Sequence, residues 1–277
     1  MKKHIGIQGI QGSYHHQVAL SYFGENITID PCLSFKELVD NIVNGVSTDA
    51  VMAIENSIAG SIIPNYAYID DHDLIICGEY YLPIHHCLMA LEGQSISDIK
   101  EVYSHPMALL QCKDFFRKNP HIKLVEDIDT AEVAKRISEQ KLKGIAAIAS
   151  SIAADIFGLQ ILAREIQTIK NNSTRFFVIS NSKTKLIAPE NANKASLKFV
   201  LDHKQGSLAA VLNALSHCGL DLTKIQSLPV IETPWQYAFF VDVTFTQAKD
   251  YLKAIQLLEM MTTHLKVLGL YKKHNIL

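Results

Sequence analysis

The chain has 277 residues, enough for about two domains, and its 48% hydrophobic content can bury a substantial core. The net charge is −2 with no basic block, which argues against a nucleic-acid footprint and a polybasic membrane patch. The apolar runs fall well short of the roughly 18 residues of a spanning helix, and the N-terminal apolar stretch is too short for a signal peptide.

Cysteine usage indicates reduced thiols. The five cysteines form no CxxC pair, which favours a cytoplasmic protein over a disulfide framework. His85, His86 and Cys87 are adjacent, but neighbours on a strand point to opposite faces, so we expect no metal site there.

The first predicted strand, His4 to Gln8, runs into a glycine turn over 9–13 and a helix over 14–23. Glycines permit the tight turn, and Ser13 is a suitable N-cap, so the helix start exposes N–H groups to an anion. The turn is not GxGxxG and no acidic residue stands at the ribose position, which disfavours a dinucleotide site.

A second helix, over 34–45, shows a capping box of Ser34 and Glu37 before an apolar helical stripe. The following strand, over 50–54, ends in the polar triplet 55–57. Open α/β sheets hold their ligands at such a position, although an ordinary polar turn has the same appearance.

Two long strands, over 73–80 and 84–91, follow one another without a helix between them and join near Pro83. This interruption of the strand–helix rhythm predicts a passage between two lobes near residues 80–84.

Beyond this passage come a strand over 101–103 and a helix that follows Ser104, His105 and Pro106. Ser104 is the expected N-cap, and Pro106 fits the first turn. His105 fits either a proton donor or a structural histidine.

Further strands over 122–126 and 145–149 flank a helix over 130–140, and Ser150 opens a helix of small residues. Polar residues therefore stand at four strand exits. Alternating strands and helices predict a mostly parallel sheet with ligands at its carboxyl ends, and the lobe change predicts two sheets with a cleft between them.

The stretch 172–177 contains Thr174 and Arg175 directly before an apolar, strand-like run. A cation and hydroxyls at a strand mouth suit a small anionic ligand. The alternative is a solvated strand-end charge, with Thr174 filling space.

The residues after a polar linker over 182–193 form a separate pattern. The pattern begins with a strand over 196–202 and a helix from Gly206 to Gly219. Two strands follow, over 220–228 and 237–245, joined through a turn at Thr233, Pro234 and Trp235. The last elements are a helix over 247–263 and a strand over 267–271. This βαββαβ order is ferredoxin-like and holds no evident catalytic cluster, which favours binding or assembly.

These motifs, in this order, resemble prephenate dehydratase with a C-terminal ACT regulatory domain. The matching stretches are 9–14, 54–57 with Gly60, 104–106 with 108–109 and 111–112, 130–131, 147–150 and 172–176, followed by 206–208 and 222–225. The resemblance covers nearly the whole chain. It implies an α/β fold: a two-lobed, periplasmic-binding-protein-like catalytic domain over 1–181 and a ferredoxin-like βαββαβ ACT domain over 195–277.

The resemblance also implies a reaction, in which prephenate loses CO2 and its ring hydroxyl to give phenylpyruvate in L-phenylalanine biosynthesis, without metal or organic cofactor. It further implies that Thr174 is required and that the site lies between the lobes. A threonine is too weak an acid to supply a proton, so we interpret Thr174 as a donor to the leaving oxygen, and we predict Glu55, or else His105, as the acid. The predicted substrate-binding residues are Ser13, Asn56, Ser57, Ser104, His105, Ser150, Asn172, Arg175 and Phe176.

Phenylalanine is the expected effector, bound between ACT domains of two subunits in a homodimer or homotetramer. The predicted effector residues are Gly206, Ser207, Leu208, Asp221, Leu222, Gln226, Ser227 and Pro229. The family's Glu-Ser-Arg-Pro is Gln226-Ser227-Leu228-Pro229 here. This loss of two charges argues against full feedback inhibition by phenylalanine.

Two other functions remain open. One is the same chemistry on arogenate, the amino analogue of prephenate. The other is a two-lobed sensor that binds an amino acid or carboxylate without chemistry.

Overall fold

The computed structural model describes residues 2–182, 185–202, 204–230, 233 and 236–274; the predicted turn at Pro234 and Trp235 lies outside them. The chain divides into two compact units, which interleave in sequence. Unit 1 comprises residues 1–61 and 81–176, and unit 2 comprises 62–80 and 177–277. Strands β5 (Ile75–Pro83) and β11 (Ser173–Ser180) each continue from one unit into the other.

The first lobe of unit 1 is a parallel sheet with β1 in the centre. Its elements are β1 (Lys3–Gln8), α1 (Tyr14–Phe23), β2 (Ile27–Cys32), α2 (Phe35–Val43) and β3 (Asp49–Asn56), with the two-residue β4 (Gly60–Ser61) paired to β3. Ser13 and Ser34 cap the two helices as predicted. The capping box is incomplete, because the Glu37 carboxylate accepts from the N–H of Leu33 and not from that of Ser34.

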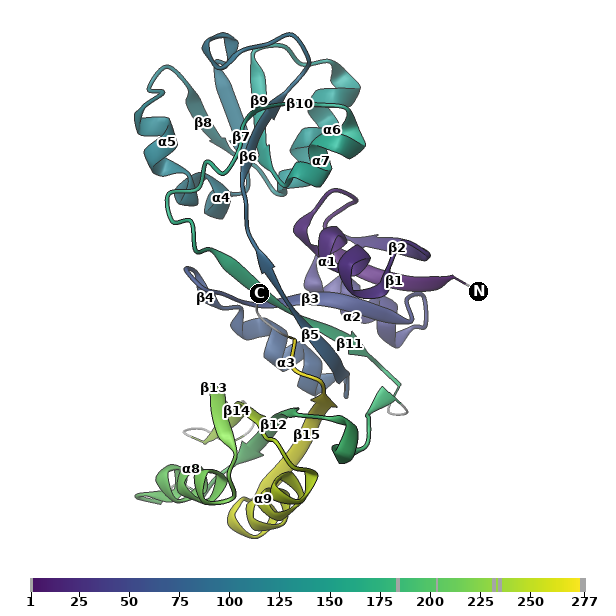
Figure 1. The fold of residues 1–277 in the computed structure, drawn as a ribbon, viewed down its shortest axis with the longest axis vertical. Coiled ribbons are helices and arrows are strands. Elements are labelled where there is room, and N and C mark those ends of the chain that lie inside the picture. The colour runs from purple at the N-terminus through teal and green to yellow at the C-terminus, as the bar shows by residue number, and fades with distance from the viewer. Residues whose placement is uncertain (1, 183–184, 203, 231–232, 234–235, 275–277) are drawn as a thin grey trace. The chain divides into compact units, whose positions relative to one another are not determined.

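The second lobe of unit 1 is a mixed sheet between two pairs of helices (Figure 1). The strand order is β10 (Gln160–Ala163), β6 (Cys87–Ala90), β9 (Ile145–Ala149), β7 (Glu101–Ser104) and β8 (Lys123–Glu126). Helices α4 (Pro106–Gln111) and α5 (Lys113–Arg117) cover one face, and α6 (Thr130–Gln140) and α7 (Ser151–Phe157) cover the other; a 3-10 turn, η1 (Ile96–Asp98), precedes β7.

Side chains of β6 alternate between these two faces, as the period of a strand requires. Leu88 and Ala90 pack with α4 and α5, whereas Cys87 and Met89 pack with α6 and α7. Both faces are therefore apolar, and the polar residues of this lobe gather at the ends of its strands.

The C-terminal module of unit 2, residues 194–271, has the predicted βαββαβ order. Its elements are β12 (Lys194–Val200), α8 (Ser207–His217), β13 (Asp221–Pro229), β14 (Tyr237–Thr244), α9 (Ala248–Met261) and β15 (His264–Tyr271), preceded by a 3-10 turn, η3 (Pro189–Asn191). The sheet order is β13-β14-β12-β15, antiparallel throughout. Helices α8 and α9 cover one face (Figure 1), where Leu197, Phe199 and Val241 enter the core.

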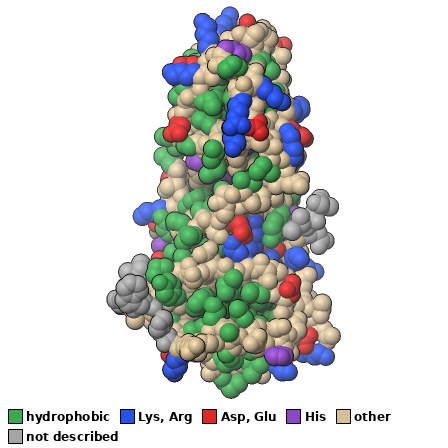
Figure 2. Space-filling model, turned by 90° about the vertical axis from the view of Figure 1, so that its left-hand side faces the viewer, with side chains coloured by type: hydrophobic (Ala, Val, Ile, Leu, Met, Phe, Trp, Pro, Cys, Tyr) green, Lys and Arg blue, Asp and Glu red, His purple; other side chains and the backbone are tan. Residues whose placement is uncertain are grey.

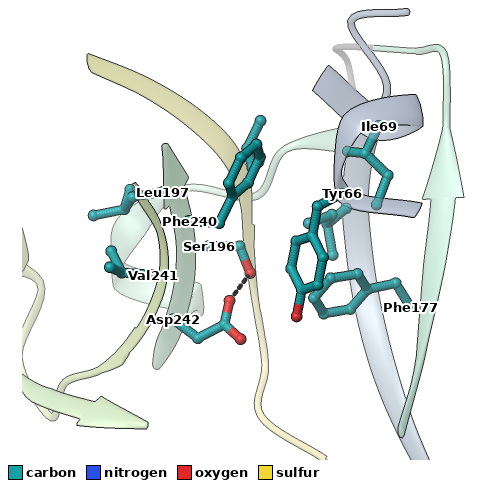
Figure 3. Close-up of a pocket in the computed structure, with 10 residues that line it drawn as sticks. Tyr66, Ile69, Phe177, Ser196, Leu197, Phe240, Val241 and Asp242 are labelled. Atoms are coloured by element: carbon teal, nitrogen blue, oxygen red, sulfur yellow. Dashed lines mark hydrogen bonds between the residues drawn. The ribbon is translucent and has the colours of Figure 1, made fainter. Parts of the chain in front are cut away.

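The other face of this sheet is covered by α3 (Ile63–Asp71), a helix with no counterpart among the predicted elements. The Tyr66 ring of α3 lies 5.5 Å from the ring of Phe240 and 6.4 Å from that of Phe177, centroid to centroid. Figure 3 shows these rings around a cavity of about 10 Å³, beside the 2.5 Å hydrogen bond from Ser196 Oγ to Asp242. Unit 2 thus includes a helix that precedes the module in sequence.

No helix among the described residues is long and apolar enough to cross a membrane.

Candidate functional site

Thr174, at the start of β11, meets Asn56, at the end of β3. Asn56 Nδ2 lies 2.9 Å from Thr174 Oγ1 and 2.8 Å from Asn172 Oδ1. The two chain segments are tied by reciprocal bonds, from the N–H of Ser57 to the carbonyl of Ser173 (2.8 Å) and from the N–H of Ser173 to Ser57 Oγ (3.0 Å). The structure therefore brings four predicted site residues together, namely Asn56, Ser57, Asn172 and Thr174.

The orientation of the Asn56 amide is set by the backbone. Its Oδ1 accepts from the N–H groups of Ile58 (3.0 Å) and Ala59 (2.9 Å), so the side that faces Thr174 must be the NH2 group. Thr174 Oγ1 is then an acceptor in this bond, and its own O–H remains available to donate. A donor hydroxyl held by a fixed amide suits a leaving oxygen that gains negative charge.

The hydrogen-bond network continues beyond Asn172 to residues that were not predicted. Asn172 Nδ2 donates to Gln111 Oε1 at 2.9 Å. His86 Nε2 also lies 2.9 Å from Gln111 Oε1, and His86 Nδ1 lies 2.8 Å from the Tyr14 hydroxyl. Tyr14 and Gln111 stood within the motifs of the resemblance, whereas His86 stood out only in the rejected metal triplet.

Burial keeps three ionisable side chains of this region, His15, His86 and Tyr14, neutral. It lowers the pKa of His15 to about 3, and Nε2 of this imidazole accepts from the N–H of Ala53. Burial likewise lowers the pKa of His86 and raises the pKa of Tyr14 well above its usual value. The network therefore works through neutral donors and acceptors at physiological pH.

The glycine turn after β1 packs against the start of α7, which joins the two lobes of unit 1. Ser150 Oγ donates to the Gly12 carbonyl at 2.6 Å and caps α7 by accepting from the N–H of Ala153. Gly12 has φ +90°, and a Cβ there would lie 3.1 Å from Ala153 Cα. Ser13 and Ser150 are both buried and both cap helices, as predicted.

Arg175 and Phe176 lie on different faces of β11. Phe176 is buried with its ring centroid 5.0 Å from that of His15, and alternation places it on the same face as Thr174. Arg175 is only 4% exposed, and its guanidinium carbon lies 5.7 Å from the centre of the Tyr81 ring. The alternative of a solvated strand-end charge is therefore wrong.

Ser104 differs from its predicted role. It is fully buried, and its hydroxyl donates to the Ile148 carbonyl at 2.8 Å, which links β7 to β9. The N-cap of α4 is His105, whose Nδ1 accepts from the N–H of Met107 at 3.2 Å. The predicted cap was wrong by one residue, because Pro106 occupies the first helical position and leaves its predecessor as cap.

The two predicted acids, Glu55 and His105, supply none of the bonds given above between Asn56, Asn172, Gln111 and His86. His105 is exposed at the start of α4. Glu55 immediately precedes Asn56 in β3, so alternation sets its side chain on the opposite face of the strand.

The triplet His85, His86 and Cys87 does not converge on one point. His85 is exposed with its Nδ1 3.8 Å from Glu165 Oε1, whereas His86 is buried against Tyr14 and Gln111. Within the described residues, no three His, Cys, Asp or Glu side chains gather as metal ligands.

The predicted effector residues occupy one helix start and one edge strand of the C-terminal module. Gly206 caps α8 with φ +83°, followed by Ser207 and Leu208. Asp221, Leu222, Gln226, Ser227 and Pro229 all lie in β13, the terminal strand of the sheet.

The chain is similar to several known enzymes along nearly its whole length. It is 32% identical to a bifunctional chorismate mutase/prephenate dehydratase of Enterobacter agglomerans, over 98% of this chain and 71% of that protein. It is 34% identical to arogenate dehydratase/prephenate dehydratase 2 of Arabidopsis thaliana, over 96% of this chain and 72% of that protein.

Solved structures share the fold. A prephenate dehydratase from Arthrobacter aurescens, in complex with L-Phe, has a TM-score of 0.87 at 25% identity over 97% of this chain and 89% of that chain. GqqA, described as a novel type of quorum quenching acylase, has a TM-score of 0.90 at 27% identity over 98% of both chains. The family model of prephenate dehydratase matches residues 5–184, which include the Asn56–Thr174 site and all of its network. This chain therefore belongs to the prephenate dehydratase family.

Proposed function

We propose that this chain converts prephenate into phenylpyruvate, water and CO2, on the route to L-phenylalanine. The single observation that carries the proposal is the bond from Asn56 Nδ2 to Thr174 Oγ1, which leaves the Thr174 hydroxyl to donate. Family membership supports the same reaction.

The reaction requires little covalent chemistry from the protein. The bond between the ring and its carboxylate breaks, the electron pair enters the ring, the bond from the ring to its hydroxyl breaks, and hydroxide takes a proton to become water. Aromatisation drives both cleavages, so the protein has to hold one conformer and stabilise the leaving oxygen. Thr174 supplies that stabilisation by donating a hydrogen bond as negative charge develops on this oxygen.

Substrate binding needs donors for two carboxylates. The amide of Gln111 and the helix starts at Ser13 and Ser150 lie in the same unit as Thr174 and offer N–H groups. We assign Asn56, Asn172 and Thr174 to the reacting centre, with Phe176 and His15 forming its apolar wall.

A purified-protein assay tests the reaction. The protein is given prephenate, and phenylpyruvate formation is followed in wild type and in Thr174→Ala. We expect turnover by wild type and a far larger loss of kcat than of substrate affinity in the variant. Undiminished kcat in Thr174→Ala would remove Thr174 from the mechanism.

Arogenate is the second candidate substrate, because the Arabidopsis relative carries both activities in its name. Arogenate carries an amino group where prephenate carries a keto group, so both substrates have the same ring and leaving groups. Running both in the same assay ranks them by kcat/KM. If neither reacts, the reaction proposed here is wrong, and acylase or binding assays come next.

We also propose that residues 1–181 form the catalytic domain and 195–277 an ACT domain that binds phenylalanine. The βαββαβ order and the L-Phe complex of the Arthrobacter relative support this. The Gly206 turn and the β13 edge supply backbone donors and acceptors for an amino acid between two copies of the module. Calorimetry with millimolar phenylalanine is expected to show heat of binding, and its absence would count against an effector site here.

A further inference from the structure

A directional chain of hydrogen bonds connects Thr174 to the Tyr14 hydroxyl through Asn56, Asn172, Gln111 and His86. Backbone N–H groups fix Asn56 Oδ1, so Asn56 donates to Asn172 Oδ1. Asn172 must then present Nδ2 to Gln111, whose Oε1 is the acceptor at 2.9 Å. Each amide orientation therefore follows from the one before it.

The same logic determines the tautomer of His86. Gln111 Oε1 has no proton, so the His86 nitrogen 2.9 Å away must be Nε2–H. The neutral ring then accepts at Nδ1, and the Tyr14 hydroxyl, 2.8 Å away, is the donor there; the His85 carbonyl, 3.1 Å from the same hydroxyl, is a second acceptor for its proton. His86 is 3% exposed, and its backbone N–H donates to Gln167 Oε1 at 3.0 Å, which helps to hold the residue in place.

These bonds determine the orientation of the Gln111 side-chain amide. Both hydrogen bonds that the described residues give its side chain end on Oε1, one from Asn172 and one from His86. Because the amide is planar, the NH2 group faces away from both donors. Two donors on one oxygen hold the amide against the 180° flip that would reverse its polarity.

We propose that His86 is a positioning residue, which uses Nε2–H to hold the Gln111 amide so that its NH2 group faces a carboxylate of the substrate, while the Tyr14 hydroxyl donates to Nδ1 and supports this tautomer. This inference rests on the proposed function for the identity of the anion. Neither His86 nor Tyr14 touches the reacting atoms.

Two amide substitutions of His86 distinguish the roles of its two ring nitrogens. His86→Gln places an amide nitrogen near the position of Nε2 and keeps the donor to Gln111, whereas His86→Asn places its amide near Nδ1 and loses that donor. We expect His86→Asn to raise KM for prephenate about tenfold to a hundredfold with kcat little changed, and His86→Gln to stay within about threefold of wild type. Equal losses in both variants, or a loss confined to kcat, would overturn the proposal.

Nitrogen-15 NMR of histidine-labelled protein reads the tautomer without any turnover, and His86→Gln assigns the signal. Wild type is expected to show neutral His86 protonated at Nε2, and Tyr14→Phe to lose this single tautomer. Tyr103→Phe is the matched control, because the Tyr103 hydroxyl bonds Glu101 in β7, and it is expected to leave the signal unchanged. A wild-type proton on Nδ1 would overturn the proposal. If wild type shows Nε2–H but turns over no prephenate, the proposed reaction fails and the orientation of the chain stands.

Discussion

At the residue scale, single side chains owe their roles to the groups that surround them. His15 illustrates this, because an ordinary imidazole becomes a neutral acceptor when it is buried between Phe35 and Phe176. Its pKa of about 3 makes folding depend on pH. The unfolded chain binds a proton near the usual pKa of about 6.5, whereas the folded protein does not until the pH reaches about 3. The contribution of neutral His15 to the unfolding free energy is therefore fully present above that usual pKa. It is lost as the pH falls from the usual pKa towards the pKa of the folded protein.

Replacing His15 with glutamine removes this pH dependence and keeps an acceptor for the Ala53 N–H. Between pH 7 and pH 5, wild type is expected to lose about 2 kcal/mol of unfolding free energy more than His15→Gln. Urea unfolding at the two pH values measures the difference. His217→Gln, at an exposed position of α8, is the control and should follow wild type. Parallel pH profiles for wild type and His15→Gln would show that His15 is not buried in its neutral form.

The local sequence predicts helix caps, but it does not predict the hydrogen bonds between residues that are far apart in the chain. Ser13 and Ser150 could be assigned because a cap bonds a backbone N–H three residues ahead, within one short stretch. The partners of Gln111 lie 25 and 61 residues away, and Asn56 lies 116 residues from Asn172. No local pattern encodes such pairs, so His86 remained unrecognised until the fold brought them together.

At the scale of elements, the strands of unit 2 are held by a buried ion pair between β12 and β5. Lys194 Nζ lies 3.0 and 2.8 Å from the two carboxylate oxygens of Glu79, and the exposed fractions of the two side chains are 1% and 0%. Removing one partner leaves the other charge buried in a low-dielectric interior.

Lys194→Met is expected to reduce the unfolding free energy by about 3–5 kcal/mol, because Glu79 then stays buried without its cation. The double variant Lys194→Met/Glu79→Leu is expected to recover most of the loss, since neither position of the pair then carries a charge. Chemical denaturation measures both. Lys123→Met, in an exposed pair with Glu101, serves as the comparison and should cost far less unfolding free energy than Lys194→Met. A double variant as unstable as the single would contradict this account.

Element order was predictable where strand and helix periods alternate, as in the βαββαβ module. Helix α3 was not, because its burial depends on packing Tyr66 against Phe240, which lies far along the chain. The strand β15 was predicted, but its pairing with β5 at Gly269 and Ile76 was not. A Cβ at Gly269 would lie 2.4 Å from the Ile76 carbonyl oxygen, so this glycine permits the pairing, which only the folded chain reveals.

At the scale of the whole molecule, the β13 edge is where a second copy is expected to bind. Terminal strands present unpaired backbone groups, and Ile225 of β13 is 40% exposed. Figure 2 shows hydrophobic side chains gathered over the α8 and β13 part of the C-terminal module. An exposed apolar patch of this kind is typical of an interface between subunits.

Ile225→Lys is therefore expected to convert the proposed dimer or tetramer into a smaller species, because a lysine on an edge strand opposes pairing. Leu252→Lys is the matched control, since Leu252 on α9 is 46% exposed and lies away from the sheet edge. Sedimentation velocity measures the species present. Assembly that survives Ile225→Lys but not Leu252→Lys would place the interface on α9 instead.

The proposed donation from the Thr174 hydroxyl to the leaving oxygen of prephenate is tested most directly by kcat in Thr174→Ser and Thr174→Val. Serine keeps the hydroxyl that accepts from Asn56, whereas valine keeps the shape of threonine and removes the hydroxyl. We expect Thr174→Ser to retain activity within about tenfold of wild type and Thr174→Val to lose about a hundredfold to a thousandfold in kcat. A valine variant as active as the serine variant would contradict the account, because shape alone would then explain Thr174.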